Sequence, residues 1–217
     1  MSTPLMFRAS MEGGDHGIAP DVSDRHGNRP DPATVALWAF MAVATSLFSL
    51  FIAAYVMRMD GTDWSVIAMP WQLWLSTMML IAGSVCLQLS NGFARHRRWD
   101  GAHLLLVSGG VFAIAFLGAQ LWAWQTLLES RVAPAGNPAG SFFYLLTAMH
   151  GLHVAGGLAG WGATLSGFHR QIGAVRVARR MRLCARYWHF LLAVWLVLFG
   201  TLGWLTPEVV RLICGTR

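Results

Sequence analysis

The chain has 217 residues, of which 55% are hydrophobic and only 12% are charged. This balance excludes an ordinary soluble domain, in which about 25% of the residues are charged. The formal charge is +6, but every cation is an arginine, and the arginines cluster between long apolar runs. Such clustering is typical of the flanks of membrane-spanning helices, and no nucleic-acid partner is expected.

The first spanning helix follows a polar segment. Residues 1–34 are rich in Gly, Pro and Asp and predict a flexible tail. From Val35 to Met57 the chain carries no charge, and a helix of this length crosses a hydrocarbon core of about 30 Å. A second apolar run covers residues 70–90 and opens with Pro70, a residue suited to the first helical turn.

Three more apolar runs complete the pattern, at residues 103–128, 141–166 and 187–206. They are separated by gaps that carry charges or helix-breaking Pro and Gly residues. The sequence therefore predicts an all-α integral membrane protein, a five-helix transmembrane bundle over residues 35–206, with a short tail at 207–217.

The arginines predict how this bundle is oriented. With five spans, the amino-terminal tail and the second and fourth gaps lie on one side of the membrane, and they hold twelve of the 16 arginines. Cytoplasmic loops carry the excess of basic residues. We therefore expect a multi-pass protein of the plasma (inner) membrane, with a cytoplasmic amino terminus and a periplasmic carboxyl terminus.

One face of the fourth run carries most of its polar and smallest side chains. Helical spacing aligns on it His150, His153, Gly157, Gly160 and Thr164. Polar groups in a span normally face other helices, and small residues let those helices approach, so this face is expected to turn inward. Gly156 and Gly160 also form a G-x-x-x-G pair, a pattern typical of close helix packing.

His150 and His153 are the sharpest candidates for chemistry, since their spacing could present two rings to one metal or one ring to a haem. Such sites need further ligands, and His103 and His189 are expected near the cytoplasmic end, at another depth. We therefore expect no metal or cofactor on this chain. The inward histidines are expected to hydrogen-bond to neighbouring helices or lipid phosphates, and Gln120 to link helices through its amide.

No catalytic set is evident elsewhere in the sequence. The chain has no nucleophile paired with a base, no phosphate-binding loop and no paired carboxylates inside a span. Cys86, Cys184 and Cys214 are widely separated and are expected to be packing residues. Composition and spacing therefore predict a membrane bundle without catalytic residues of its own.

The two carboxyl-terminal runs carry recognisable patterns. SFFYLLTAMHGLHVAGGL, from Ser141, follows roughly S-F-F-x-x-T-x-x-H-G-x-H-V-x-x-G, and YWHFLLAVWLVLF, from Tyr187, follows Y-W-H-F-x-D-x-V-W. Both resemble subunit III of the haem-copper terminal oxidases. Earlier stretches agree, and the similarity runs in unbroken order from about Trp38 to Trp204. The five-span form is similar to the shorter bacterial versions of this subunit.

The resemblance implies a non-catalytic subunit that packs on subunit I, with subunit II and smaller subunits nearby. The complex would hold haem and copper in the partner subunit, reduce oxygen to water with electrons from cytochrome c or quinol, and pump protons. This subunit would bind structural phospholipid and sustain proton uptake and the stability of the complex. Candidates for helix packing or lipid contact are His150, His153, Trp188, His189, Arg170 and Gln120.

The chain departs from the family pattern at three intramembrane carboxylates. Ala44, Ala123 and Leu192 stand where the pattern has acids. Their absence leaves open an accessory protein of a nitric oxide reductase. A self-contained haem-binding membrane cytochrome is the rival from another class, and an absorption spectrum of the isolated chain would separate it from a colourless accessory subunit.

Overall fold

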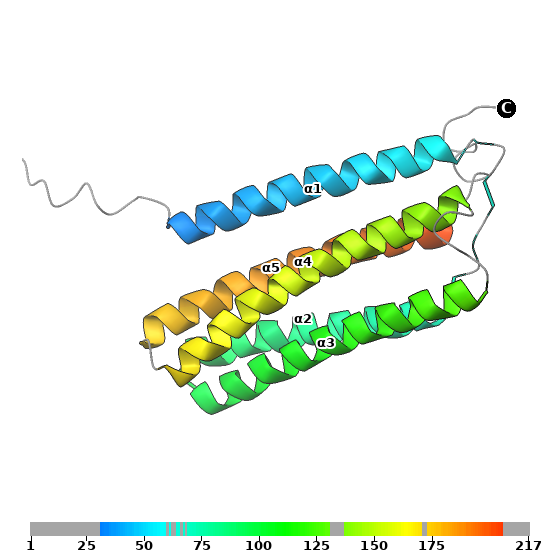
Figure 1. Cartoon of the computed structure of the whole chain (residues 1–217). Coiled ribbons are helices and arrows are strands. Elements are labelled where there is room, and N and C mark those ends of the chain that lie inside the picture. The colour runs from blue at the N-terminus through cyan, green and yellow to red at the C-terminus, as the bar shows by residue number, and fades with distance from the viewer. Residues whose placement is uncertain are drawn as a thin grey trace, which may run out of the picture.

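The computed structural model describes residues 31–59, 61, 64, 65, 67, 69–130, 137–170 and 173–205. It contains five helices, α1 (Pro32–Arg58), α2 (Gln72–Arg95), α3 (Trp99–Glu129), α4 (Pro138–His169) and α5 (Ala174–Trp204) (Figure 1). Each is long and apolar enough to cross a membrane. The predicted all-α bundle with five spans is confirmed, whereas most of both predicted tails lies outside the described residues.

Local sequence sets several helix ends. Pro138 occupies the first turn of α4, where its missing N–H costs nothing, and the Asn137 side chain caps that helix by accepting from the Ala139 N–H at 3.0 Å. The Asn137 amide also donates to the Ser65 carbonyl at 2.9 Å, which ties the α1–α2 connection to the start of α4. At the other end, Gly173 precedes α5 with φ +97°, a conformation that favours glycine.

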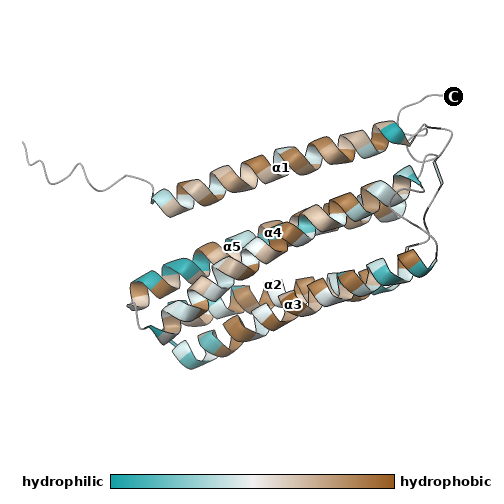
Figure 2. Cartoon of the chain, viewed as in Figure 1, coloured by the Kyte–Doolittle hydropathy of each residue, from teal (hydrophilic) through white to brown (hydrophobic). Residues whose placement is uncertain are grey.

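Helix α5 begins at Ala174, thirteen residues before the apolar run that predicted it. The added segment is rich in Arg and Ala, which both favour helix. Its inner face, Val177 and Met181, packs on Ala94 and Ala102. The arginines between them give this end of α5 the hydrophilic colour in Figure 2. The fourth gap is thus largely helical and amphipathic.

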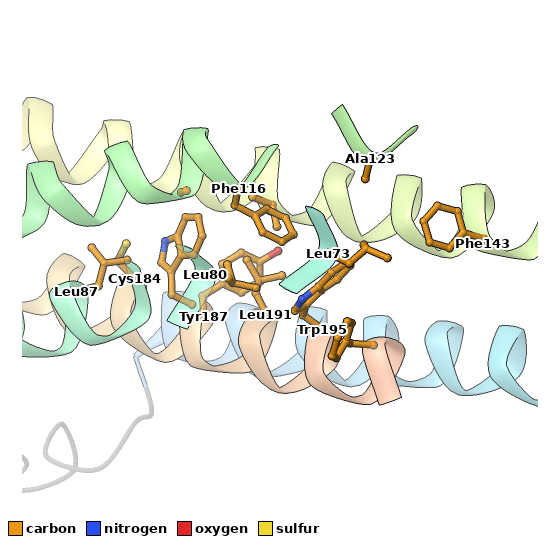
Figure 3. Close-up of a cluster of buried hydrophobic side chains, with 14 of the residues drawn as sticks. Leu73, Leu80, Leu87, Phe116, Ala123, Phe143, Cys184, Tyr187, Leu191 and Trp195 are labelled. Carbon is orange, nitrogen blue, oxygen red and sulfur yellow. The ribbon is translucent and has the colours of Figure 1, made fainter. Parts of the chain in front are cut away.

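Four of the five helices form the core of the bundle, and α1 lies at its edge. Helices α2 and α3 lie side by side, α4 and α5 pack next to them, and α1 lies on the far side of α4 and α5 (Figure 1). The main core joins α2, α3, α4 and α5 around Phe116, Trp188 and Trp195. Figure 3 shows Phe116 and Trp195 turned toward each other between the helices, with ring centroids 5.2 Å apart.

Glycines let two pairs of helices approach closely. A Cβ on Gly83 would lie 3.3 Å from the Gly109 carbonyl oxygen, so α2 and α3 touch backbone to backbone. A Cβ on Gly110 would lie only 2.2 Å from the Trp161 ring, and the Trp161 Nε1–H donates to the Leu106 carbonyl at 2.8 Å. Trp161 therefore fastens α4 onto the glycine face of α3.

Candidate functional site

His150, on α4, lies at the point where three other helices meet. Its side chain is completely buried, and its ring centroid lies 6.3 Å from Phe48 of α1, 5.7 Å from Phe116 of α3 and 5.1 Å from Trp195 of α5. Neither ring nitrogen has a hydrogen-bond partner among the described residues. The expected bond from this ring to a neighbouring helix is therefore wrong, because aromatic side chains, not polar ones, surround it.

Neutral hydrogen bonds link the helices around this aromatic cluster. The Trp195 Nε1–H donates to the Thr77 hydroxyl at 2.9 Å, joining α5 to α2. The Gln120 amide donates to the Ser76 hydroxyl, also at 2.9 Å, joining α3 to α2, which is an interhelical bond of the kind predicted for this glutamine. Each such bond contributes on the order of 1 kcal/mol within a membrane.

His153 lies one turn further along α4 and is half-buried. Its Nδ1 lies 2.7 Å from the Met149 carbonyl, so Nδ1 carries the proton and the bond stays within α4. The ring packs against Phe40 and Phe48 of α1, at 5.7 and 5.2 Å between centroids. The Tyr187 hydroxyl donates to the His153 carbonyl at 3.0 Å. This turn of α4 therefore contacts both α1 and α5.

His189 belongs to a separate polar cluster on α2 and α5. Its Nδ1 lies 2.6 Å from the Ser84 hydroxyl oxygen and its Nε2 lies 3.0 Å from Gln88 Oε1. Since a carbonyl-type oxygen only accepts, Nε2 carries a proton, and the Ser84 hydroxyl can donate to Nδ1. The structure thus pairs His189 with α2 and not with the α4 histidines. Within the described ranges, no three His, Cys, Asp or Glu side chains gather as metal ligands.

The remaining two candidates lie in different surroundings. Trp188 is buried in the main core, and a Cβ on Gly157 would lie 3.4 Å from its ring. Arg170 is exposed just after the end of α4, where its backbone N–H bonds to the Ser166 carbonyl at 3.0 Å. Trp188 is therefore positioned to pack helices, and Arg170 lies outside the bundle.

The glycines of α4 behave differently from one another. A Cβ on Gly157 would lie 3.0 Å from the Tyr187 ring and 3.2 Å from the Leu191 side chain, as the inward stripe predicts. A Cβ on Gly156 or Gly160 would meet nothing within 4 Å. The prediction that Gly156 and Gly160 form a helix-packing pair is therefore wrong, because this face of α4 borders an open groove.

The three positions that lack the family's acids are apolar and largely enclosed. Ala44 and Ala123 are buried, and Leu192 packs against the main core. The acidic residues within the described ranges are Asp31, Asp100 and Glu129, all at or next to helix ends. The described interior therefore offers neutral hydrogen-bonding groups and aromatic rings, and no carboxylate for proton transfer.

Sequence reasoning missed several polar contacts between helices. The Thr77–Trp195 bond, the Ser84–His189–Gln88 cluster and the Trp161–Leu106 bond were not predicted. One signal was available, since the adjacent pair Gly109–Gly110 in an apolar run is typical of a surface that another helix approaches closely. Serine and threonine in spans carry no comparable signal, because most of them bond to their own helix.

Comparison with known proteins gives similarity over most of the chain. No known protein-family profile matches it. It is 25% identical over 195 residues to cytochrome c oxidase subunit 3 of Alkalihalophilus pseudofirmus, covering 83% of this chain and 94% of that protein. It is 28% identical over 177 residues to the same subunit of a Bacillus species, covering 76% and 82%. A probable quinol oxidase subunit 3 of Staphylococcus haemolyticus is 23% identical over 172 residues, covering 76% and 85%.

Proposed function

We propose that this chain, a divergent relative of oxidase subunit 3, is the non-catalytic third subunit of a proton-pumping haem-copper terminal oxidase. The complex would reduce oxygen to water, with its haem and copper in the partner subunit. The chain would pack on subunit I, near subunit II and smaller subunits, in the plasma membrane. It would hold structural phospholipid and sustain proton uptake and the stability of the complex.

One observation carries this proposal. The similarity to subunits named as oxidase subunit 3 extends over 172 to 195 residues, with 82 to 94% of each of those proteins covered. Similarity of this length covers 76 to 83% of this chain, so it does not rest on one motif. Relatives of both cytochrome c and quinol oxidases are found, and either electron donor fits the proposal.

The interior supports an auxiliary role over a catalytic one. Several of its neutral polar groups link helices, as in the Trp195–Thr77 and Gln120–Ser76 bonds. The positions of the three family acids are apolar, so we propose that this subunit supports proton uptake through the stability of its partner and not by carrying protons itself. The arginine-bearing connections from α2 to α3 and from α4 to α5, together with the start of α5, would face the cytoplasm.

The rival haem-binding cytochrome requires space beside an axial histidine. Three aromatic rings stand within 6.3 Å of the His150 ring, between centroids, and both of its ring nitrogens are buried. A haem on His150 would require these rings to move, which favours the auxiliary subunit.

Affinity purification of the tagged full-length chain from its native membrane tests the proposal. The expected result is co-purification of a haem-containing oxidase subunit, oxygen consumption by the complex, and no Soret band for the chain once separated. A haem band on the separated chain would overturn the proposal. So would a partner complex that reduces nitric oxide and not oxygen.

A further inference from the structure

A small cavity lies at the end of the bundle opposite the arginine-rich start of α5. The end of α1, the start of α4 and the end of α5 lie together there (Figure 1). The cavity has a volume of about 50 Å³. One water needs about 15 Å³ of such space, so the cavity has room for roughly three waters. Its lining includes Tyr55, Trp64, Pro70, Ala139 and Gly203.

Tyr55 brings an unpaired hydroxyl to this cavity. The residue is only 5% exposed, and its hydroxyl has no hydrogen-bond partner among the described residues. Its ring is held edge-on against Trp64 and Phe142, at 5.1 and 5.7 Å between centroids. By contrast, the Tyr187 hydroxyl donates directly to the His153 carbonyl at 3.0 Å. A buried hydroxyl without a partner destabilises a protein, so a partner for Tyr55 is expected in the cavity.

Two further polar groups belong to residues that line the same cavity. The Trp64 indole N–H has no partner among the described residues. The Gly203 carbonyl lacks the usual helical bond, because that bond comes from the residue four positions later, and Pro207 has no N–H. An indole only donates, a carbonyl only accepts and a phenol does both. Together they match a water, which needs two to four polar partners.

We infer that this cavity binds ordered water, which connects the Tyr55 hydroxyl of α1 to the carbonyl end of α5. Bonds through water are nearly as favourable as direct ones and join groups that do not touch. The hydroxyls of Thr45 and Ser46 bond within α1 itself. The water site therefore gives α1 a polar connection at the end far from its ion pair with Arg179. This inference goes beyond the proposed function and does not depend on it.

Thermal unfolding of the full-length chain in detergent tests the inference through the sign of one shift. Tyr55→Phe keeps the ring and removes only the hydroxyl. Since water binds that hydroxyl, the variant loses hydrogen bonds, and its melting temperature should fall by about 3 °C. Removing an unpaired hydroxyl would instead relieve a buried polar group. An unchanged or raised melting temperature would therefore overturn the inference.

Two other variants connect this shift to the cavity. Tyr187→Phe is the matched control, because it removes a hydroxyl with a direct bond, and it should lower the melting temperature by a similar amount. Ala139→Val adds two methyl groups to the cavity lining and should displace the water. In that background Tyr55→Phe should have almost no further effect, because the two changes remove the same water. A full loss in that background would overturn the inference.

Water-edited solid-state NMR of the tyrosine-labelled chain in liposomes detects the water directly. The chain has only three tyrosines, and Tyr55→Phe identifies the signal of that residue. Magnetisation from water should reach the Tyr55 ring faster than the Tyr187 ring, and equal transfer would overturn the inference. The melting temperature of the wild type should be the same in sodium chloride and in choline chloride. A clear gain in sodium would assign the cavity to a cation and not to water.

Discussion

Helices α1 and α2 cross the same bundle but are held in opposite ways. The most apolar 18 residues of α1 have a mean hydropathy of 2.1, and only 11% of them are buried. The corresponding stretch of α2 has a mean hydropathy of 1.5, and 44% of it is buried. Helix α2 meets its neighbours through Gly83, Ser76 and Thr77. The more apolar helix is thus the less packed one. In a bilayer, small and polar residues join helices, and hydrophobicity alone does not.

Helix α1 lacks those joining residues. The hydroxyls of Thr45 and Ser46 bond back to carbonyls of α1 itself. Grooves of about 470 and 410 Å³ separate it in part from α5. Large side chains such as Val43 and Leu50 are about two-thirds exposed, as expected for a surface that faces lipid or another subunit. Substitutions in the two regions should therefore differ sharply in cost.

The largest difference is expected between two tryptophans. Trp195→Ala should cost about 3 kcal/mol of unfolding free energy, because it leaves a cavity beside His150 and removes the bond to Thr77. Trp38→Ala, at an exposed position of α1, should cost less than about 1 kcal/mol. Denaturant titration in detergent micelles, followed by circular dichroism, measures both. Equal costs would mean that α1 is as firmly packed as α5.

Two glycines of α3 offer the next comparison. Gly110→Ala should cost about 2 kcal/mol, since the new Cβ would displace the Trp161 ring and its bond to Leu106. Gly118→Ala should be neutral or slightly stabilising, because its Cβ meets nothing and alanine favours helix. The same titration measures both variants. A neutral Gly110→Ala would show that α3 and α4 can separate freely.

Replacing His189 or His150 with methionine should lower the stability of the protein by different amounts. His189→Met removes hydrogen bonds to Ser84 and Gln88 and should cost about 1 kcal/mol. His150→Met should cost less, because that ring has no hydrogen bond among the described residues and a thioether packs well among aromatic rings. Thermal unfolding of the two variants in one detergent ranks them. A larger loss for His150→Met would reveal a polar partner for that ring.

The smallest effect is expected where α1 is tied to α5 by charge. Asp31→Asn removes the ion pair with Arg179, in which both side chains are about one-third exposed. Pairs of this kind contribute about 0 to 1 kcal/mol and weaken in salt. Unfolding measured at low and at high salt should therefore show a small loss that disappears as salt rises. A loss that persists in high salt would indicate a role beyond this pair.

The sequence was sufficient to predict the number of helices but not all of their ends. Uncharged runs of about 20 residues identify spans directly, and all five appear. The first turns of α5 were missed, because a hydropathy criterion does not detect a helix that continues into water. Arginine-rich segments of this kind are identified by helix propensity and by a buried stripe such as Val177 and Met181.

The candidate site could be predicted only in part. Helical spacing correctly turned His150 and Gly157 inward, because the direction of a side chain follows from its position along the helix. It could not show what each would meet there. Gly156 and Gly160 have the spacing of a packing pair, yet they border empty space because α1 stands off from α4. The residues that each side chain contacts depend on how the helices assemble, and the sequence of one helix does not determine this.

The long arginine-bearing start of α5 has a consequence for how the bundle sits in its bilayer. Arg176, Arg180 and Arg186 are fixed along one continuous helix over about 15 Å, so none can adjust its height without moving the others. Sliding α5 inward would drag a guanidinium into hydrocarbon, at a cost of a few kcal/mol. The arginines of this segment therefore fix how deeply the protein is inserted in the membrane.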